Sequence, residues 1–278
     1  MEDEFVYSPE TVPPVREIRR PHIGWAAVFA VLYFLAQMIL VVVLGWKYGR
    51  AALLPDSHDP HHALAMLIAS MGAAVLTILF GWPLMRAFWG RPFWDVLHWN
   101  WPHAQVRLGK LAAIGLAMSI LAATLERFLT LPKEMPIESM FQSRGVVWGM
   151  TFYGVIVAPI FEETMFRGFL LPAFAVAIDW MLPKRERPYY ESDLSLPAVV
   201  TSSIMTSAAF GLMHAQQLGF AWNAVVLLSC VGMVLAWVRL HFRSVACSAV
   251  VHATYNGVMF FAMFLATGGY RHFDKLQR

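Results

Sequence analysis

The sequence has few charged residues, which excludes an ordinary soluble domain. Only 14% of its 278 residues are Asp, Glu, Lys or Arg, whereas 58% are hydrophobic. A soluble domain carries about 25% charged residues, and the mean hydropathy of this chain is +0.55. The composition therefore predicts a polytopic membrane protein. The formal net charge of +3 is what basic loops between membrane helices produce, and it indicates no nucleic-acid partner.

Cysteine is almost absent as well. The two cysteines, Cys230 and Cys247, lie in or beside apolar segments, so a disulfide framework is excluded and both are predicted to be small apolar helix residues. The N-terminal segment 1–22 lacks the short apolar core and small-residue cleavage site of a secretory signal. The first apolar run after it is expected to remain as a membrane anchor.

The apolar runs predict an all-α bundle of seven or eight transmembrane helices, because about 20 apolar residues in a helix span the hydrocarbon core. The runs lie at about 23–45, 63–85, 108–125, 146–163, 168–182, 196–214, 220–238 and 245–266. The run 168–182 is short, and it either crosses the membrane or lies along its interface. The predicted organisation is a tail (1–22), three N-terminal transmembrane helices (23–144), a core (145–267) and a C-terminal tail (268–278).

The basic residues give a modest indication of orientation. With eight spans Lys and Arg are distributed almost evenly between the two sides, whereas with an interfacial 168–182 they favour an N-terminus on the inner face. Both versions place the end of the fourth helix toward the inner face. The prediction is a multi-pass integral membrane protein, in the cell membrane if bacterial, with a cytoplasmic N-terminus.

Three charged residues interrupt the apolar stretch "APIFEETMFRGFLLP" (158–172), namely Glu162, Glu163 and Arg167. A charge at the bilayer centre costs about 2.5–3.5 kcal/mol on the mildest scale. Residues four apart share a helix face, so Glu163 and Arg167 are expected to pair. Glu162 is left over. A spare carboxylate either binds a cation or takes up a proton, and the latter suits a general base or acid.

Two further polar pairs lie in apolar segments. Phe210 and His214 are four apart in "FGLMH", and His252 and Asn256 are four apart in "HATYN". An imidazole can hold a water, take a proton or bind a metal, and an asparagine amide can donate to an oxyanion. A single buried histidine often has only a structural role. With Glu162, however, these side chains come from three helices, which suits a site inside the bundle.

Taken in order, "EETMFR" (162–167), "FGLMH" (210–214) and "HATYN" (252–256) resemble the EExxxR, FxxxH and HxxxN motifs of one family. This is the CAAX prenyl protease 2 and bacteriocin-processing family (CPBP, or Abi) of intramembrane proteases. The resemblance covers about 145–267. The three helices before it carry no motif of the family.

The resemblance implies a role for each motif residue. Glu162 would activate water, and His214 would hold that water. Glu163 and Arg167 would shape and neutralise the site. His252 and Asn256 would stabilise the oxyanion. Phe210 would be a packing partner, and the substrate would be a peptide or a C-terminally lipidated protein in the membrane, with lipids as the other partners and no nucleic acid.

Whether a metal takes part is left open by the sequence. Glu162, His214 and His252 would form an adequate zinc ligand set with a position left for water. However, the HExxH pattern that fixes two ligands on one helix is absent from the sequence, and the same residues serve a metal-free glutamate protease equally well. Two other functions compete with a protease: a catalytically quiet binding or regulatory member of the family, and a small proton-coupled transporter. Buried ionisable residues suit a transporter, but the internal repeats typical of transporters are not apparent.

Overall fold

The computed structural model describes residues 21–53, 61–130, 132, 144–183 and 194–272. Within these ranges the chain is helical and contains no strand. Seven helical segments are long and apolar enough to cross a membrane: Ile23–Tyr48, His62–Trp89, Leu108–Glu126, Gly145–Met181, Leu196–Met213, Trp222–Phe242 and Val245–Ala266. The predicted all-α polytopic bundle is therefore confirmed, in its seven-span version. Most of the two predicted tails lies outside the described residues.

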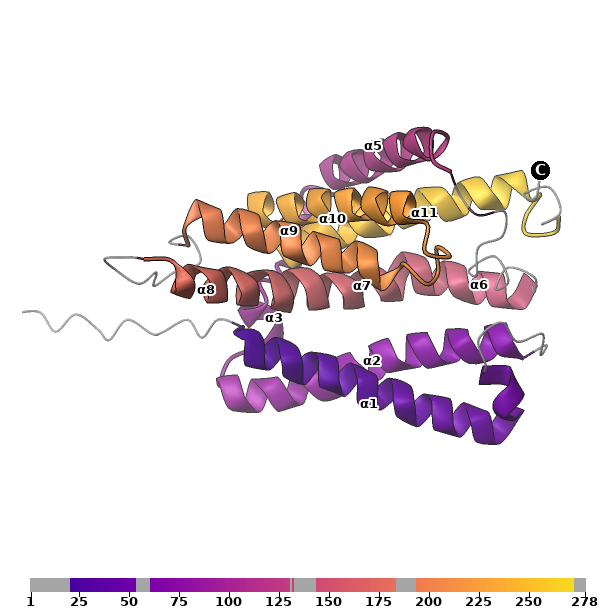
Figure 1. The fold of residues 1–278 in the computed structure, drawn as a ribbon, viewed down its shortest axis with the longest axis horizontal. Helices are drawn as coiled ribbons and strands as arrows, with labels where there is room; N and C mark the ends of the chain where they lie inside the picture. The colour runs from indigo at the N-terminus through magenta and orange to yellow at the C-terminus, as the bar shows by residue number, and fades with distance from the viewer. Residues whose placement is uncertain (1–20, 54–60, 131, 133–143, 184–193, 273–278) are drawn as a thin grey trace, which may run out of the picture.

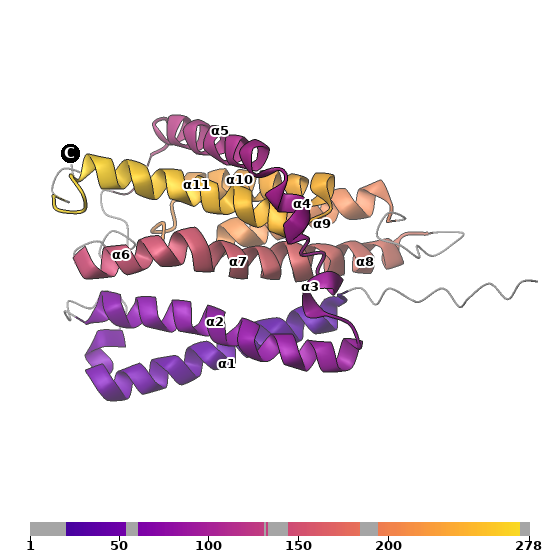
Figure 2. The same ribbon diagram turned by 180° about the vertical axis from the view of Figure 1, so that it is seen from behind.

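Helices α1 (Ile23–Tyr48) and α2 (His62–Trp89) form a hairpin along one side of the bundle (Figure 1). The short helices α3 (Phe93–Val96) and α4 (Trp101–Gln105) then run across the bundle to α5 (Leu108–Glu126), which lies along the opposite side (Figure 2). Helix α5 is therefore separated from α1 and α2 by the other helices of the bundle.

The central element is one long helix. It comprises α6 (Arg144–Phe152), the π-helical segment η3 (Tyr153–Val157), α7 (Ala158–Glu163), the π-helical segment η4 (Thr164–Leu170) and α8 (Leu171–Met181). The expectation that 168–182 is a separate span or an interfacial segment is therefore wrong. The two glutamates lie in the middle of a continuous helix rather than at the end of a span.

Two prolines explain the π-helical segments. Pro159 and Pro172 each follow directly after the residue that caps a π segment, Ala158 and Leu171 respectively. A proline has no N–H and collides with the carbonyl of the preceding turn, which normally kinks or ends a helix. The wider i→i+5 turn accommodates the proline: the N–H of Ala158 donates to Tyr153 O, and that of Leu171 to Phe166 O. The helix therefore continues through both.

The remaining helices cover the side of the long helix away from α1 and α2. These are α9 (Leu196–Met213), α10 (Trp222–Phe242) and α11 (Val245–Ala266). Helix α5 packs on α11, where Gly115 allows close approach: a Cβ at this position would lie 2.7 Å from the carbonyl oxygen of Val251. The motif-bearing helices thus pack on other helices of the same chain.

Buried aromatic rings fasten the N-terminal helices to the long helix. Phe29 of α1 stacks on Phe169 with ring centroids 4.6 Å apart and on Phe161 at 5.9 Å. Trp89 of α2 stacks on Phe93 of α3 at 5.9 Å. Burying rings of this size contributes much of the packing energy of a core. This cluster reaches Phe161, the residue before Glu162, and so supports the site from one side.

Candidate active site

The long helix brings Glu163 and Arg167 into the predicted ion pair. Nη1 of Arg167 donates to Oε1 of Glu163 at 2.9 Å, and both side chains are fully buried. Nη2 of Arg167 donates to the carbonyl oxygen of Gly232 on α10 at 2.6 Å. The guanidinium lies 4.9 Å from the ring centroid of Phe210, a cation–π contact. The arginine thus links the long helix to α9 and α10.

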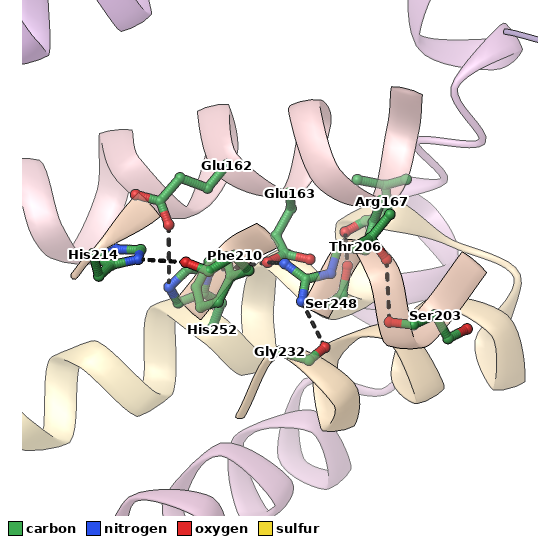
Figure 3. A network of polar contacts seen from close by, with 11 residues as sticks. Glu162, Glu163, Arg167, Ser203, Thr206, Phe210, His214, Gly232, Ser248 and His252 are labelled. Carbon is green, nitrogen blue, oxygen red and sulfur yellow. Dashed lines mark hydrogen bonds and ion pairs between the residues drawn. The ribbon is translucent and has the colours of Figure 1, made fainter. Parts of the chain in front are cut away.

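Glu163 also holds the first histidine. Nδ1 of His252, on α11, donates to Oε1 of Glu163 at 3.0 Å. Since a carboxylate only accepts hydrogen bonds, Nδ1 carries the hydrogen. This leaves Nε2 of His252 on the side of Glu162, whose Oε2 lies 3.9 Å away (Figure 3). That distance is too long for a hydrogen bond, but it places the imidazole and the carboxylate side by side.

The second histidine follows the last residue of α9. Nδ1 of His214 donates to the carbonyl oxygen of Phe210 at 2.8 Å, which leaves Nε2 of the neutral ring as an acceptor. Figure 3 shows His214 and the carboxylate of Glu162 at one end of the polar network and Ser203 at the other, with Arg167 between them. The Phe210 ring packs against His214, His252 and Phe166, as expected of a packing partner.

Asn256 lies one turn after His252 on α11, but its amide is engaged. Nδ2 donates to the backbone carbonyl of Gly154 in η3 at 2.6 Å. Asn256 is expected to donate to an oxyanion, and this role therefore competes with its hydrogen bond to the Gly154 carbonyl.

Burial distinguishes the two carboxylates. Glu163 and Arg167 are 0% exposed and His252 is 3% exposed, whereas Glu162 is 9% exposed. His214 and Asn256 are half-buried. Glu163 is therefore enclosed by its partners, whereas Glu162 keeps a small exposed fraction.

Two tyrosines near Glu162 belong to none of the three motifs. Tyr33 of α1 packs on Phe161 with ring centroids 4.8 Å apart, and Tyr33 and Tyr153 are both close enough to Glu162 to interact with its charge. The signal in the sequence is weak, because a single tyrosine in an apolar run is as common in a core as in a site. Tyr33 shows that α1 borders the site.

The residues do not gather into a metal site as they stand. Among the residues that the structure describes, no three His, Cys, Asp or Glu side chains are grouped so that they could hold a metal ion. His252 directs Nδ1 at Glu163, and His214 directs Nδ1 at a carbonyl. Both imidazoles thus use Nδ1 for these hydrogen bonds, and Nε2 is the atom of each ring through which a metal ion would be bound.

Comparison with known proteins identifies the family. Residues 144–258 match the family model "Type II CAAX prenyl endopeptidase Rce1-like". This segment belongs to the CPBP family. The match begins at the start of α6 and ends just after Asn256 on α11, so it contains all three motifs, and the family assignment made from them is confirmed. No curated protein and no solved structure matches the chain.

The matched family model describes prenyl endopeptidases, which are proteases, and this description supports a hydrolase. The seven apolar helices agree with an integral multi-pass protein. Helices α1, α2 and α5 lie outside the matched CPBP segment, although α1 borders the site through Tyr33.

Proposed function

We propose that the protein is an intramembrane endopeptidase in which Glu162 activates the water that attacks a peptide bond. The observation that carries this proposal is the position of His252 between two carboxylates, with Nδ1 3.0 Å from Glu163 and Nε2 3.9 Å from Glu162. One carboxylate orients the imidazole, and the other remains to take a proton. This division of roles is typical of general acid–base catalysis.

In the first step Glu162 takes a proton from water while the water oxygen bonds to the carbonyl carbon. Nε2 of His214 accepts a hydrogen bond from this water and holds it in place. The carbonyl oxygen becomes an oxyanion, to which Nε2–H of protonated His252 donates. Charge stabilisation of this kind commonly makes the largest contribution to catalysis of acyl transfer.

In the second step Glu162 returns the proton to the amide nitrogen, and the carbon–nitrogen bond breaks. The products are a carboxylic acid and an amine, which exchange one proton to become a carboxylate and an ammonium group, so atoms and protons balance without another reactant. Arg167 neutralises Glu163 throughout, which keeps Glu163 an acceptor for His252. The proposed substrate is a peptide or a C-terminally lipidated protein that enters from the membrane, as the CPBP resemblance implies.

The test is cleavage of quenched-fluorescent peptides, lipidated and unlipidated, by the purified protein and its Glu162→Gln variant. Glutamine keeps the shape of glutamate but cannot take the proton, so kcat is expected to fall by about 10²–10⁴. Glu126→Gln, at the end of α5, is the matched control and should leave kcat unchanged. Full activity of Glu162→Gln would refute the mechanism.

Addition of a strong chelator to the wild type decides the question of a metal. The proposed mechanism predicts unchanged activity. If the chelator abolishes activity and added zinc restores it, the water is activated by a metal ion and not by Glu162 alone.

A further inference from the structure

Positive charge is concentrated in two segments of the chain, the connection from α2 to α5 and the turn between α10 and α11. Residues 90–110 and 237–250 together contain five Lys or Arg residues and one acidic residue, Asp95, so their net charge is +4. The five are Arg91, Arg107, Lys110, Arg239 and Arg243. This excess is larger than the net charge of +3 of the whole chain.

The fold brings these two segments together. The N–H of Val245 donates to the carbonyl oxygen of His98 at 3.0 Å, and the hydroxyl of Ser244 donates to that of Asn100 at 3.2 Å. Helix α4 also packs on α11 (Figure 2). The basic residues of both segments therefore lie at the same end of the bundle.

Three of the cations gather around one apolar cluster. Nζ of Lys110 lies 5.3 Å from the centroid of the Phe242 ring, a cation–π contact. Arg107 and Arg239 both lie close enough to Cys247 to interact with it electrostatically. Phe242 and Cys247 belong to one buried cluster, and Arg239 is only 2% exposed. Lys110 is exposed and Arg107 is partly exposed, so a ligand can reach these two side chains.

The cluster has little negative charge to balance it. Among the residues that the structure describes, Arg107, Lys110 and Arg243 form no ion pair with a carboxylate, and neither does Asp95. Nη1 of Arg107 contacts the ring and the carbonyl oxygen of His103, and neither group carries a negative charge. Like charges beside an apolar cluster repel one another, and a bound anion would relieve this repulsion.

Tryptophans mark this end of the bundle as a membrane–water interface. Trp94 and Trp99 pack together in the α3–α4 connection with ring centroids 5.2 Å apart, and Trp101 is 45% exposed. Tryptophan is enriched at the level of the lipid headgroups. The unbalanced cations therefore lie at the depth at which headgroup phosphates are found.

We propose that Arg107 and Lys110, with Arg239 behind them, bind the headgroup of an anionic phospholipid. Basic pockets between membrane helices are sites of this kind. The headgroup phosphate accepts hydrogen bonds from the guanidinium of Arg107 and the ammonium of Lys110. The acyl chains lie along α5, where Leu116 and Ile120 are 45% and 58% exposed. This site does not involve the catalytic glutamate, so the inference is independent of the proposed function.

The experiment measures lipid binding to the purified full chain in a neutral detergent. Native mass spectrometry gives the Kd for phosphatidylglycerol, and phosphatidylcholine is the neutral counterpart. Wild type should bind phosphatidylglycerol more tightly than phosphatidylcholine. A cation near an anionic lipid surface contributes about a fivefold factor in affinity. Arg107→Gln/Lys110→Gln should therefore weaken phosphatidylglycerol binding by about tenfold or more.

The matched control removes two cations from the opposite end of the bundle. It is Lys47→Gln/Arg127→Gln. Arg127 follows the last residue of α5, whereas Arg107 precedes the first, and Nζ of Lys47 also lies over a ring, that of Tyr48, at 5.1 Å. The control should change the Kd for phosphatidylglycerol by less than about twofold. An equal loss in both double variants overturns the proposal, because it would reflect net charge alone.

Thermal unfolding of the same proteins gives a second readout. Phosphatidylglycerol should raise the Tm of wild type and of the control, but much less that of Arg107→Gln/Lys110→Gln. Equal stabilisation by phosphatidylcholine, or by inorganic phosphate at the same concentration, overturns the assignment to an anionic lipid. If the double variant does not fold, the exposed single substitution Lys110→Gln replaces it, with an expected loss of about fivefold in affinity. An unchanged affinity of that variant overturns the proposal.

Glu162→Gln separates this inference from the proposed function. It should bind phosphatidylglycerol as wild type does, whether or not it cleaves peptides. A loss of lipid binding in Glu162→Gln would place the lipid at the candidate active site and overturn the proposal.

Discussion

Substituting methionine for Arg167 leaves the carboxylate of Glu163 buried without the cation that neutralises it. Both side chains are fully buried and 2.9 Å apart, so water cannot take the place of the guanidinium. Removing one partner of a buried ion pair typically costs about 3–5 kcal/mol. The carbonyl of Gly232 loses its donor as well. His252 keeps its hydrogen bond to Glu163 and limits the loss, so we expect about 4 kcal/mol.

The second substitution Glu163→Gln should recover part of this loss. In the double variant both charges are gone, and a neutral pair in place of a buried ion pair is often close to neutral in stability. Glutamine can still accept the hydrogen bond from Nδ1 of His252. We therefore expect the double variant to be about 1–3 kcal/mol more stable than Arg167→Met alone.

The assay is reversible unfolding of the purified variants in mixed micelles, followed by circular dichroism or by tryptophan fluorescence. Arg107→Met is the matched control. Nη1 of Arg107 also contacts a residue four away, His103, at 3.3 Å, but both are only part-buried. Such partly solvated pairs contribute about 0–1 kcal/mol.

Two results would refute the reasoning. One is a cost for Arg167→Met as small as that for Arg107→Met. The other is a double variant that is less stable than Arg167→Met, because this would mean that the buried charge of Glu163 needs no cation.

Three further predictions concern other helices. His214→Ala should lower kcat for peptide cleavage by about 10²-fold or more while KM changes little, because the ring is proposed to hold the attacking water. A rise in KM with kcat unchanged would contradict this role. Gly115→Leu should destabilise the protein by about 1–3 kcal/mol in micelle unfolding, since its side chain would enter the α5–α11 contact, whereas Gly109→Leu on open surface should not. Asp179→Ala removes an acceptor for the N–H and the hydroxyl of Ser195, at 3.0 and 2.6 Å, and should cost about 1–3 kcal/mol without changing the activity of the folded fraction.

Local periodicity made part of the site predictable. Residues four apart lie on the same helix face whatever the helix packs against, so the pairing of Glu163 with Arg167 and the contact of Phe210 with His214 could be inferred from spacing. Low charge and long apolar runs predicted the membrane helices, because both follow from the cost of exposing polar groups to lipid. The order of the three motifs identified the family without coordinates.

The continuity of the long helix was not predictable in the same way. The two apolar runs 146–163 and 168–182 predicted a break near 163–168, where the charged residues lie. The helix continues because the charges neutralise one another and because side chains of other helices take up carbonyls near the prolines: Asn256 pairs with Gly154, and the hydroxyl of Ser202 donates to Leu171 O at 2.6 Å. These donors come from distant parts of the sequence.

By itself, then, the sequence determined the all-α membrane class, the family and the contacts within one turn, since these depend on composition, on the order of the motifs and on the 3.6-residue period. Only the tertiary structure decided which side chains from other helices contact the long helix at Glu163 and at Gly154. His252 reaches Glu163 across 89 residues, and Asn256 reaches Gly154 across 102. Contacts of this kind depend on which helices pack together and how closely, and no period in the sequence encodes that.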